Sequence, residues 1–333
     1  MKQAVFALGA LFAVAGGLSA AAPKHKVKIA LIVASTVDDK GWCQSMHDAI
    51  KEVQKQDAGT YKVEYSYSEK MKPVDAGSAA RQYASKHFEI IICHGAQYKN
   101  LVLEMAEEFP TTSFVFGTSA EIGPKNVFTY MPESEQTGYL NGIIAGMVTK
   151  SNIVGLVGPV DGGDAARYDR GFVLGAKSVN PKVDVKVAHT GSFSDFVKAG
   201  ELAQTQVKAG ADFLTGSSQQ ALGALRAVAE FKDKPIWWAG QDTSQLGIPE
   251  SFKVLGAASY DYTAVVRELI KRRESGVLGG ENIPLTFANK GFVYKFNEKV
   301  GPVLTPDIRK AVDKAKGDLT TGKLQLAWKD VKF

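Results

Sequence analysis

The sequence contains only two cysteines, Cys43 and Cys93, among its 333 residues. This count excludes the small folds that depend on several disulfides, although an exported protein can still form one bridge. After residue 22, no run approaches the roughly 18 consecutive apolar residues of a membrane-spanning helix, so we expect a soluble mature protein. The 40 basic and 35 acidic residues are interspersed without charge blocks, and we therefore expect no binding of nucleic acid.

Motifs for catalysis and phosphate binding are also missing. The sequence has no G-x-S-x-G, no G-x-x-x-x-G-K-[ST] and no H-E-x-x-H. The stretch "GPVDGGDAA" (158–166) is rich in glycine, but it lacks the G-x-G-x-x-G spacing and carries two aspartates that would repel a pyrophosphate. A nucleophile built from Cys43 and His47 would need an orienting third group and an oxyanion hole, and the sequence identifies neither. We therefore expect neither an enzyme nor a cofactor.

The first 22 residues differ from the rest of the chain. Lys2 precedes the apolar run "AVFALGALFAVAGGLSAAA", which closes on small residues. This pattern predicts a secretory signal peptide that is cleaved near Ala20 to Ala22. Because no cysteine lies near the cleavage point, we expect a periplasmic or extracellular protein that is not a lipoprotein.

Short apolar runs alternate with amphipathic segments through most of the chain. The run "KIALIVAS" (28–35) predicts a buried strand, and "CQSMHDAIKEVQKQ" (43–56) predicts a helix with one apolar face. Repetition of this rhythm predicts a parallel sheet covered by helices on both faces. The rhythm restarts with a helix over 133–150, which indicates a second unit of the same architecture. We therefore expect an α/β fold of two doubly wound lobes, whose parallel sheets surround a hinged cleft.

Each lobe is expected to use separate pieces of the chain. A helix over 263–275 is placed to cross back to the first lobe, and the segment that follows predicts a turn-linked strand pair and a final helix. The expected boundaries assign 23–130 and about 258–285 to the N-terminal lobe. The C-terminal lobe then comprises 131–257 and part of 286–333.

The best candidates for function are the residues that directly follow strands, because ligands of such folds bind at the carboxyl ends of parallel strands. Trp42 stands where the first strand gives way to a helix, so its indole either stacks on a planar ligand or caps the core of the lobe. Gly95 and Gly216 belong to two further strand ends. Several tyrosines also lie at or near strand ends and favour an aromatic ligand over a simple sugar: Tyr98, Tyr130, Tyr168 and Tyr260.

Two aspartates allow a binding interpretation and a structural one. Asp242 directly follows a strand, and its carboxylate can accept two hydrogen bonds from vicinal hydroxyls such as those of a ribose. Alternatively, Asp242 bonds its own backbone in a turn, as is common in an Asp-Thr-Ser context. Asp39 either contacts a ligand or caps the helix over 43–56.

A metal site is the main rival interpretation. Cys43 and His47 are four residues apart on one helical face, and Cys93 and His94 end a strand that should neighbour the first. Two thiolates and two imidazoles suit Zn²⁺ or copper. The spacing matches no recognised zinc pattern, and adjacent residues of a strand point to opposite faces of the sheet. A Cys43–Cys93 disulfide and two free buried thiols are the other possibilities.

These features together resemble the basic membrane protein family of ABC-transporter substrate-binding proteins, whose best-known members capture purine nucleosides. The family's opening motif D-K-S-F-N-Q-S corresponds to "DKGWCQS" (39–45) here. The resemblance covers nearly all of the mature chain, and its other segments are "ESEQTGYLNGIIAGMVTKSN" (133–152), "GFVLGAKSVNP" (171–181), "GSFSDFVKAGELAQTQVKAGADFL" (191–214) and "WAGQDTSQL" (238–246). It implies a type I periplasmic binding fold, a monomer, a small-molecule ligand (a purine nucleoside or base) and an ABC-transporter permease as partner.

The resemblance also suggests roles for individual residues. Trp42 stands where the family has a ring-stacking phenylalanine, Asp242 where an aspartate holds the ribose, and Tyr168 where an aromatic residue forms an opposite wall. Cys43 replaces an asparagine that reads the base, so His47 is a candidate to take over that role. The family's lysine after the next strand has no counterpart in "GAASYDYTAV" (256–265).

These departures leave other ligands and roles open. A wide aromatic clamp would also hold riboflavin or another flavin. A metal-binding carrier and a ligand-sensing receptor with its own membrane partner are further alternatives.

Overall fold

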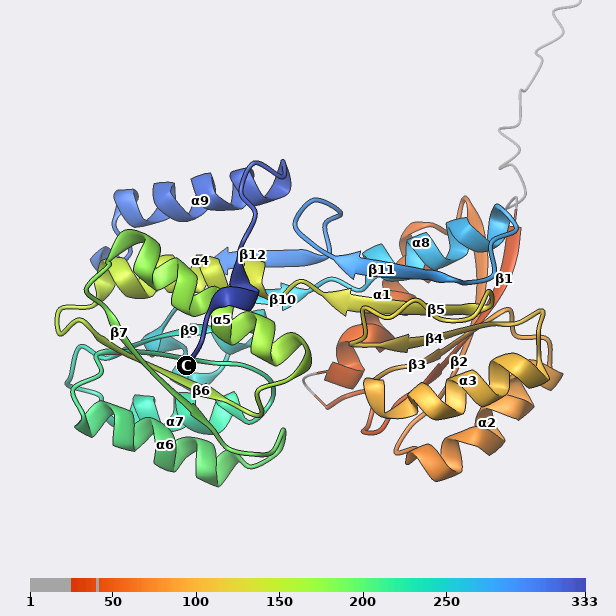
Figure 1. Ribbon diagram of the computed structural model, residues 1–333, viewed down its shortest axis with the longest axis horizontal. Coiled ribbons are helices and arrows are strands. Elements are labelled where there is room, and N and C mark those ends of the chain that lie inside the picture. The colour runs from red at the N-terminus through yellow and green to blue at the C-terminus, as the bar shows by residue number, and fades with distance from the viewer. Residues whose placement is uncertain (1–24, 40–41) are drawn as a thin grey trace, which may run out of the picture.

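The computed structural model describes residues 25–39 and 42–333, so the predicted signal peptide lies outside the described residues. The chain forms two lobes that lie side by side and are joined by several crossing segments (Figure 1). Each lobe is built on one six-stranded sheet covered by helices, which confirms the predicted two-lobe α/β fold. In the described part of the chain, no helix is both long enough and apolar enough to span a membrane.

The N-terminal lobe contains a fully parallel sheet in the order β11-β5-β4-β3-β1-β2. Its strands are β1 (His25–Ile32), β2 (Tyr61–Ser68), β3 (Ile90–Cys93), β4 (Ser113–Gly117), β5 (Val127–Pro132) and β11 (Glu281–Leu285). Its helices are α1 (Trp42–Gln56), α2 (Pro73–Ser85), α3 (Lys99–Glu108) and α8 (Thr263–Glu274). Alternate residues of β1 pack on opposite sides: Ile29 and Leu31 share a core with α1 and α8, whereas Ala30 and Ile32 share one with α2 and α3.

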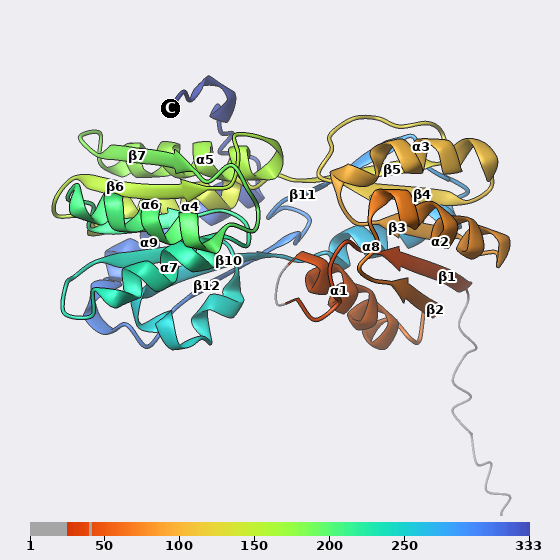
Figure 2. The ribbon, with the colours of Figure 1, turned by 90° about the horizontal axis from the view of Figure 1, so that it is seen from below.

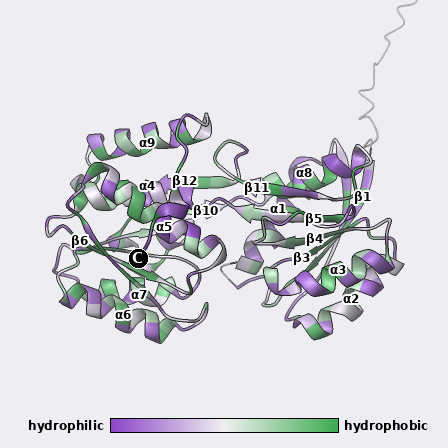
Figure 3. Cartoon of the chain, viewed as in Figure 1, coloured by the Kyte–Doolittle hydropathy of each residue, from purple (hydrophilic) through white to green (hydrophobic). Residues whose placement is uncertain are grey.

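The C-terminal lobe repeats this plan with the sheet order β12-β10-β9-β8-β6-β7. Its strands are β6 (Ile153–Gly158), β7 (Asp184–His189), β8 (Phe213–Gly216), β9 (Trp237–Gly240), β10 (Val254–Tyr260) and β12 (Phe292–Phe296). One face packs on α4 (Glu135–Val148), α5 (Gly163–Val179) and α9 (Pro306–Thr320), and the other on α6 (Phe196–Lys208) and α7 (Ala221–Glu230). Figure 3 shows the strands largely in the hydrophobic colour and the helices with hydrophobic and hydrophilic residues alternating, as helices with one buried face require.

The chain passes between the lobes three times: between β5 and α4, between β10 and α8, and between β11 and β12. Figure 2 shows these connections between the two lobes. Hydrogen bonds tie the crossings together: Glu133 N–H donates to the Leu285 carbonyl (2.9 Å), and Asp261 N–H donates to the Gly291 carbonyl (2.8 Å). Helix α8 packs on α1, so it returns to the first lobe as the sequence predicts.

Two features of the sheets differ from the sequence-based expectation. Strand β5 was not predicted at all, although it lies inside the N-terminal sheet between β4 and β11. Strands β11 and β12 do exist, but the prediction that they pair with each other was wrong. β11 adds a parallel strand beside β5, and β12 adds an antiparallel strand beside β10 in the other lobe. The segment that joins them is a lobe crossing rather than a hairpin turn.

Candidate functional site

A cleft of about 730 Å³ lies where the two lobes face each other. The N-terminal lobe lines it with residues of α1 and the loop before it, among them Asp39, Trp42, Ser45, Asp48 and Glu52. The C-terminal lobe lines it from the ends of β8, β9 and β10 and from α6 and α7, with Ser218, Gln219, Gln241, Asp242, Ser259, Tyr260 and Phe196 among others. The cleft therefore lies at the carboxyl ends of parallel strands, where the fold predicts a ligand site.

Trp42 is the first residue of α1 and is partly buried at the wall of the cleft. Its indole stacks on the His94 ring, with centroids 4.4 Å apart and planes 14° apart. Tyr260 and Tyr262 meet it edge-on, at centroid distances of 5.9 and 5.6 Å. Trp42 thus packs against the core of its lobe and also faces the cleft, so the structure accommodates both sequence-based interpretations.

His94 holds Trp42 in position from the interior of the N-terminal lobe. Its side chain is fully buried, and burial lowers the pKa of the imidazole to about 3. Because a carbonyl can only accept, His94 Nε2 carries the proton and donates to the Trp42 carbonyl oxygen at 3.0 Å. His94 Nδ1 then accepts from the Tyr130 hydroxyl. Both ring nitrogens are therefore used within the lobe.

Asp39 and Asp242 line the cleft and also hold the local backbone. The Asp39 carboxylate caps α1 by accepting from the backbone N–H groups of Cys43 (3.2 Å) and Gln44 (3.1 Å). Asp242 Oδ1 accepts from Ser244 N–H at 2.8 Å and caps the short 3₁₀ helix Thr243–Leu246. The structural interpretations of both aspartates hold, and neither contact removes its carboxylate from the cleft wall.

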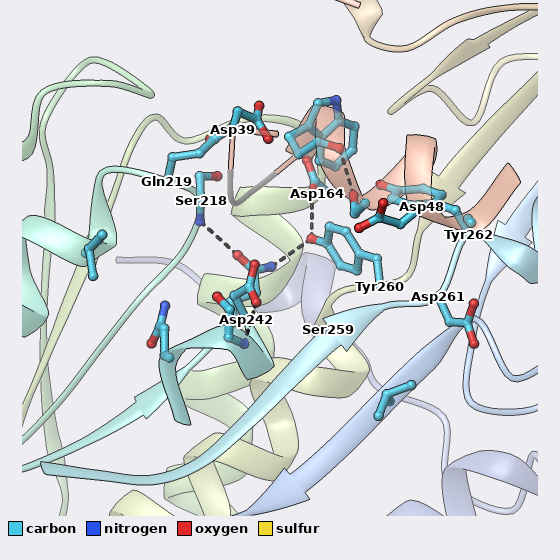
Figure 4. A pocket seen from close by; sticks show the side chains of 18 of the residues that line it. Asp39, Asp48, Asp164, Ser218, Gln219, Asp242, Ser259, Tyr260, Asp261 and Tyr262 are labelled. Carbon is cyan, nitrogen blue, oxygen red and sulfur yellow. Dashed lines mark hydrogen bonds between the residues drawn. The ribbon is translucent and has the colours of Figure 1, made fainter. Parts of the chain in front are cut away.

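The hydroxyl of Tyr260 is the centre of a hydrogen-bond network at the base of the cleft (Figure 4). Its hydroxyl donates to Asp164 Oδ2 at 2.6 Å and accepts from Gln241 Nε2 at 2.8 Å. The hydroxyl of Ser134, at the start of the first lobe crossing, also donates to it at 2.9 Å. Gln241 Oε1 in turn accepts from Ser218 N–H at 2.8 Å. Burial raises the pKa of the Asp164 carboxyl.

Three other candidates lie in the interior of the lobes, away from the cleft. Cys43 packs in the core of the N-terminal lobe, and burial raises the pKa of its thiol to about 12. The Tyr98 hydroxyl donates to the Met71 carbonyl at 2.6 Å. Tyr168 is fully buried in α5 and bonds Asn141 and Thr215.

His47, Gly95 and Gly216 also stand outside the cleft lining. His47 Nδ1 bonds the Tyr65 hydroxyl at 2.8 Å on another side of α1. Gly95 has a φ of 144°, a conformation that favours glycine. A Cβ at Gly216 would lie 2.7 Å from the Val157 carbonyl oxygen. The close approach of β6 to β8 therefore accounts for glycine at this position.

The structure does not arrange Cys43, His47, Cys93 and His94 as a metal site. Cys43 and Cys93 are both buried, free thiols. Across residues 25–39 and 42–333, no group of three or more His, Cys, Asp or Glu side chains is arranged to hold a metal ion.

The sequence-based list missed several polar residues of the cleft. Ser45, Asp48 and Glu52 follow Trp42 at helical spacing and share its face of α1. That spacing was visible in the sequence once Trp42 was placed at the cleft. Asp164 belongs to the glycine-rich stretch 158–166, which was rejected as a phosphate loop, and it lines the cleft from the first turn of α5.

Comparison with known proteins identifies related proteins that align with most of the chain. A family model described as "ABC transporter substrate-binding protein PnrA-like" matches residues 26–285. The chain is 26% identical over 324 residues to the ABC transporter nucleoside-binding protein BmpA of Lactococcus lactis subsp. cremoris, covering 90% of this chain and 89% of that protein. It is also 26% identical over 314 residues to a purine-binding protein of Brucella abortus, covering 92% of this chain and 84% of that one.

A solved structure gives the same picture of the fold. An ABC transporter solute-binding protein of Conexibacter woesei DSM 14684 superimposes with a TM-score of 0.75 at 24% identity, covering 90% of this chain and 98% of that one. At this level of identity the similarity concerns the two-lobe architecture.

Proposed function

Because the chain belongs to the PnrA-like family of ABC-transporter substrate-binding proteins, we propose that it is the exported binding component of an ABC importer and that it carries a purine nucleoside or purine base. It binds and delivers its ligand without chemical change. Its partner is the permease of the importer, and it acts as a monomer outside the cytoplasm. The names of the L. lactis and B. abortus relatives, nucleoside-binding and purine-binding, support this ligand class.

The observation that carries the proposal is the placement of Trp42 in the interlobe cleft. The indole is held by the stacked His94 ring on one side and by two tyrosine edges, so it presents a rigid aromatic surface at the cleft wall. A flat heterocycle stacks well on such a surface, and stacking of a base on an aromatic side chain contributes about 1–3 kcal/mol. Phe196 adds a second aromatic side chain to the cleft from the opposite lobe.

Polar groups of the C-terminal lobe supply the complementary recognition. Asp242 already uses Oδ1 to cap a turn, which fixes its carboxylate at the cleft wall. A carboxylate held in this way can accept hydrogen bonds from the two vicinal hydroxyls of a ribose. Gln241 and Ser259 lie beside it and offer further donors and acceptors. We therefore assign the base to the Trp42 side and the ribose to the Asp242 side.

The three lobe crossings give the protein a hinge. The cleft lies at one of these crossings, since Tyr260, Asp261 and Tyr262 line it where β10 leads into α8. Binding proteins of this architecture close their lobes around the ligand by rotation at such segments. Closure would bring the Trp42 and Asp242 walls to the two ends of one nucleoside.

The test is mass spectrometry of the small molecule that is released when the purified mature protein is denatured. The proposal predicts a purine nucleoside or purine base in stoichiometric amount. Recovery of ribose with the base would support the role of Asp242, and recovery of a free base would argue against it. A stoichiometric flavin or sugar would overturn the purine assignment.

A further inference from the structure

The charge of the cleft is opposite to the charge of the protein. The full chain carries a formal net charge of +5 at pH 7. Among the described residues that line the cleft, six are acidic and one is basic. The acidic residues are Asp39, Asp48, Glu52, Asp164, Asp242 and Asp261, and the basic residue is Arg226. A cleft lined by charge of one sign concentrates the electric field and attracts ligands of the opposite sign.

Most acidic side chains of the cleft form no ion pair with another described residue. Elsewhere carboxylates pair with basic groups, as Asp57 does with Arg267 at 2.8 Å. Within the ranges that the structure describes, five of the cleft acids form no ion pair with another described residue: Asp48, Glu52, Asp164, Asp242 and Asp261. The one basic residue, Arg226, has Glu250 at 3.8 Å, so part of its own charge is compensated.

Two of these acids share one face of α1, and each accepts a hydrogen bond from a glutamine one turn away: Asp48 from Gln44 and Glu52 from Gln56. Asp48 and Glu52 are four residues apart on the cleft face of α1, where like charges repel and destabilise a helix slightly.

A second observation concerns a buried hydroxyl in the lining of the cleft that has no hydrogen-bond partner in the described protein. Tyr262 lines the cleft and is 1% exposed, and its hydroxyl has no hydrogen-bond partner within the part of the chain that is described. A buried hydroxyl without a protein partner is unfavourable, and a polar atom of a bound ligand can satisfy it.

We infer that the cleft selects its ligand by charge: it prefers a purine nucleoside that carries a cationic group to the neutral nucleoside, and it rejects nucleoside phosphates. This inference rests on the proposed function, because it concerns the same cleft. The charges of a phosphate group would face the cleft acids, and Arg226 is the single basic side chain among the described residues of the lining. A protonated amine would instead find several carboxylates within one cavity.

The experiment measures dissociation constants by calorimetry for three ligands that share one skeleton: adenosine, 5′-amino-5′-deoxyadenosine and adenosine 5′-monophosphate. The corresponding guanosine compounds replace them if guanosine binds more tightly than adenosine. We expect the cationic amine to bind about fivefold to tenfold more tightly than the neutral nucleoside, since several partly exposed charge pairs each contribute a modest amount. The monophosphate should bind at least about tenfold more weakly.

Salt and variants separate charge from shape. The preference for the amine should shrink when salt rises from about 0.1 M to about 1 M, because the screening length falls from about 10 Å to about 3 Å. The double variant Asp48→Asn/Glu52→Gln should reduce the ratio of amine to monophosphate affinity by about fivefold or more. The matched control Asp313→Asn removes one charge from the exposed side of α9, outside the cleft, and should leave the ratio unchanged.

The outcomes distinguish this inference from the proposed function. Equal binding of the amine, the neutral nucleoside and the monophosphate would overturn charge selection while leaving nucleoside binding intact. A weak monophosphate whose affinity does not respond to salt or to the double variant would attribute its rejection to shape and would also overturn the inference. Binding of no member of either series would overturn both proposals.

Discussion

At the scale of single residues, the cleft depends on side chains whose positions are fixed by their neighbours. Trp42 is held by the stacked His94 ring, and Asp242 by the backbone of Ser244. A fixed side chain loses little conformational freedom when a ligand binds, so more of its interaction energy contributes to affinity. The residue-scale predictions test whether these positioned groups make the contacts that we assign to them.

Replacing Trp42 by alanine should weaken purine binding by about 1–3 kcal/mol, because it removes the stacking surface. Calorimetric titration of the wild type and Trp42→Ala with the same nucleoside measures the difference. The control is Tyr67→Ala, which removes an exposed aromatic side chain outside the cleft and should not alter affinity. Equal affinity of Trp42→Ala and the wild type would remove Trp42 from the binding site.

The variant Asp242→Asn separates ribose binding from turn formation. Asparagine can still accept from Ser244 N–H, so the turn should persist while the charged acceptor is lost. We expect nucleosides to bind about 1.5–3 kcal/mol more weakly, the range for hydrogen bonds to charged groups, whereas free bases should be little affected. If nucleosides and bases weaken equally, Asp242 does not contact the ribose.

His94 should make the protein sensitive to acid. Its pKa is about 3 in the folded state against about 6.5 when unfolded, so the unfolded state takes up a proton first as the pH falls. Stability is therefore complete above about pH 6.5 and decreases toward pH 3. Each pKa unit between the two states corresponds to about 1.4 kcal/mol, so the loss should already be measurable at pH 5.

Urea unfolding at pH 7 and pH 5 tests this expectation in the wild type and in His94→Gln. Glutamine does not titrate, so the variant should lose less stability between the two pH values than the wild type does. This comparison also removes the contributions of the other histidines. An identical pH dependence in both proteins would show that His94 does not titrate in the predicted way.

At the scale of elements, the packing of α4 on α5 determines where the network at the base of the cleft lies. Glycines on both helices let the backbones approach closely: a Cβ at Gly142 would lie 2.2 Å from the Phe172 carbonyl oxygen, and one at Gly175 would lie 2.0 Å from that of Tyr139. Helix α5 carries Asp164 in its first turn, and Ser134 precedes α4. Close packing of the two helices thus brings both residues to the Tyr260 hydroxyl.

Gly142→Ala should therefore destabilise the protein by about 1–3 kcal/mol, because the added methyl group forces two helix backbones apart. The matched control is Gly317→Ala in α9, where a Cβ would have nothing within 4 Å. That change should stabilise the protein by about 0.5–1 kcal/mol, since alanine favours the helix over glycine. Urea unfolding measures both, and a Gly142→Ala variant as stable as the wild type would contradict the packing account.

The elements also show how far the sequence could be interpreted on its own. Strands such as β1 and helices such as α1 were predictable, because apolar runs and helical periodicity depend only on local sequence. The partners of β11 and β12 were not, because pairing across lobes is a long-range property that no local pattern records. Trp42 and Asp242 could be placed at the cleft from their position after strands. The buried position of Tyr168 depends on the side of α5 that faces β8, which its position near a strand end does not reveal.

At the scale of the whole molecule, two lobes joined by three crossings place one cleft at the hinge. The lobes contribute different chemistry to it: an aromatic surface from α1 and polar strand ends from the C-terminal sheet. A ligand with a flat base and a hydroxylated sugar matches both walls at once. This arrangement is the central claim of the account.

Calorimetric titration of the purified mature protein with purine nucleosides and bases tests that claim most directly, after unfolding, dialysis and refolding have removed any ligand carried from the host. The account predicts saturable binding of one purine nucleoside or base per protein molecule. Absence of binding by every purine nucleoside and base, in a protein that has refolded cooperatively, would contradict it.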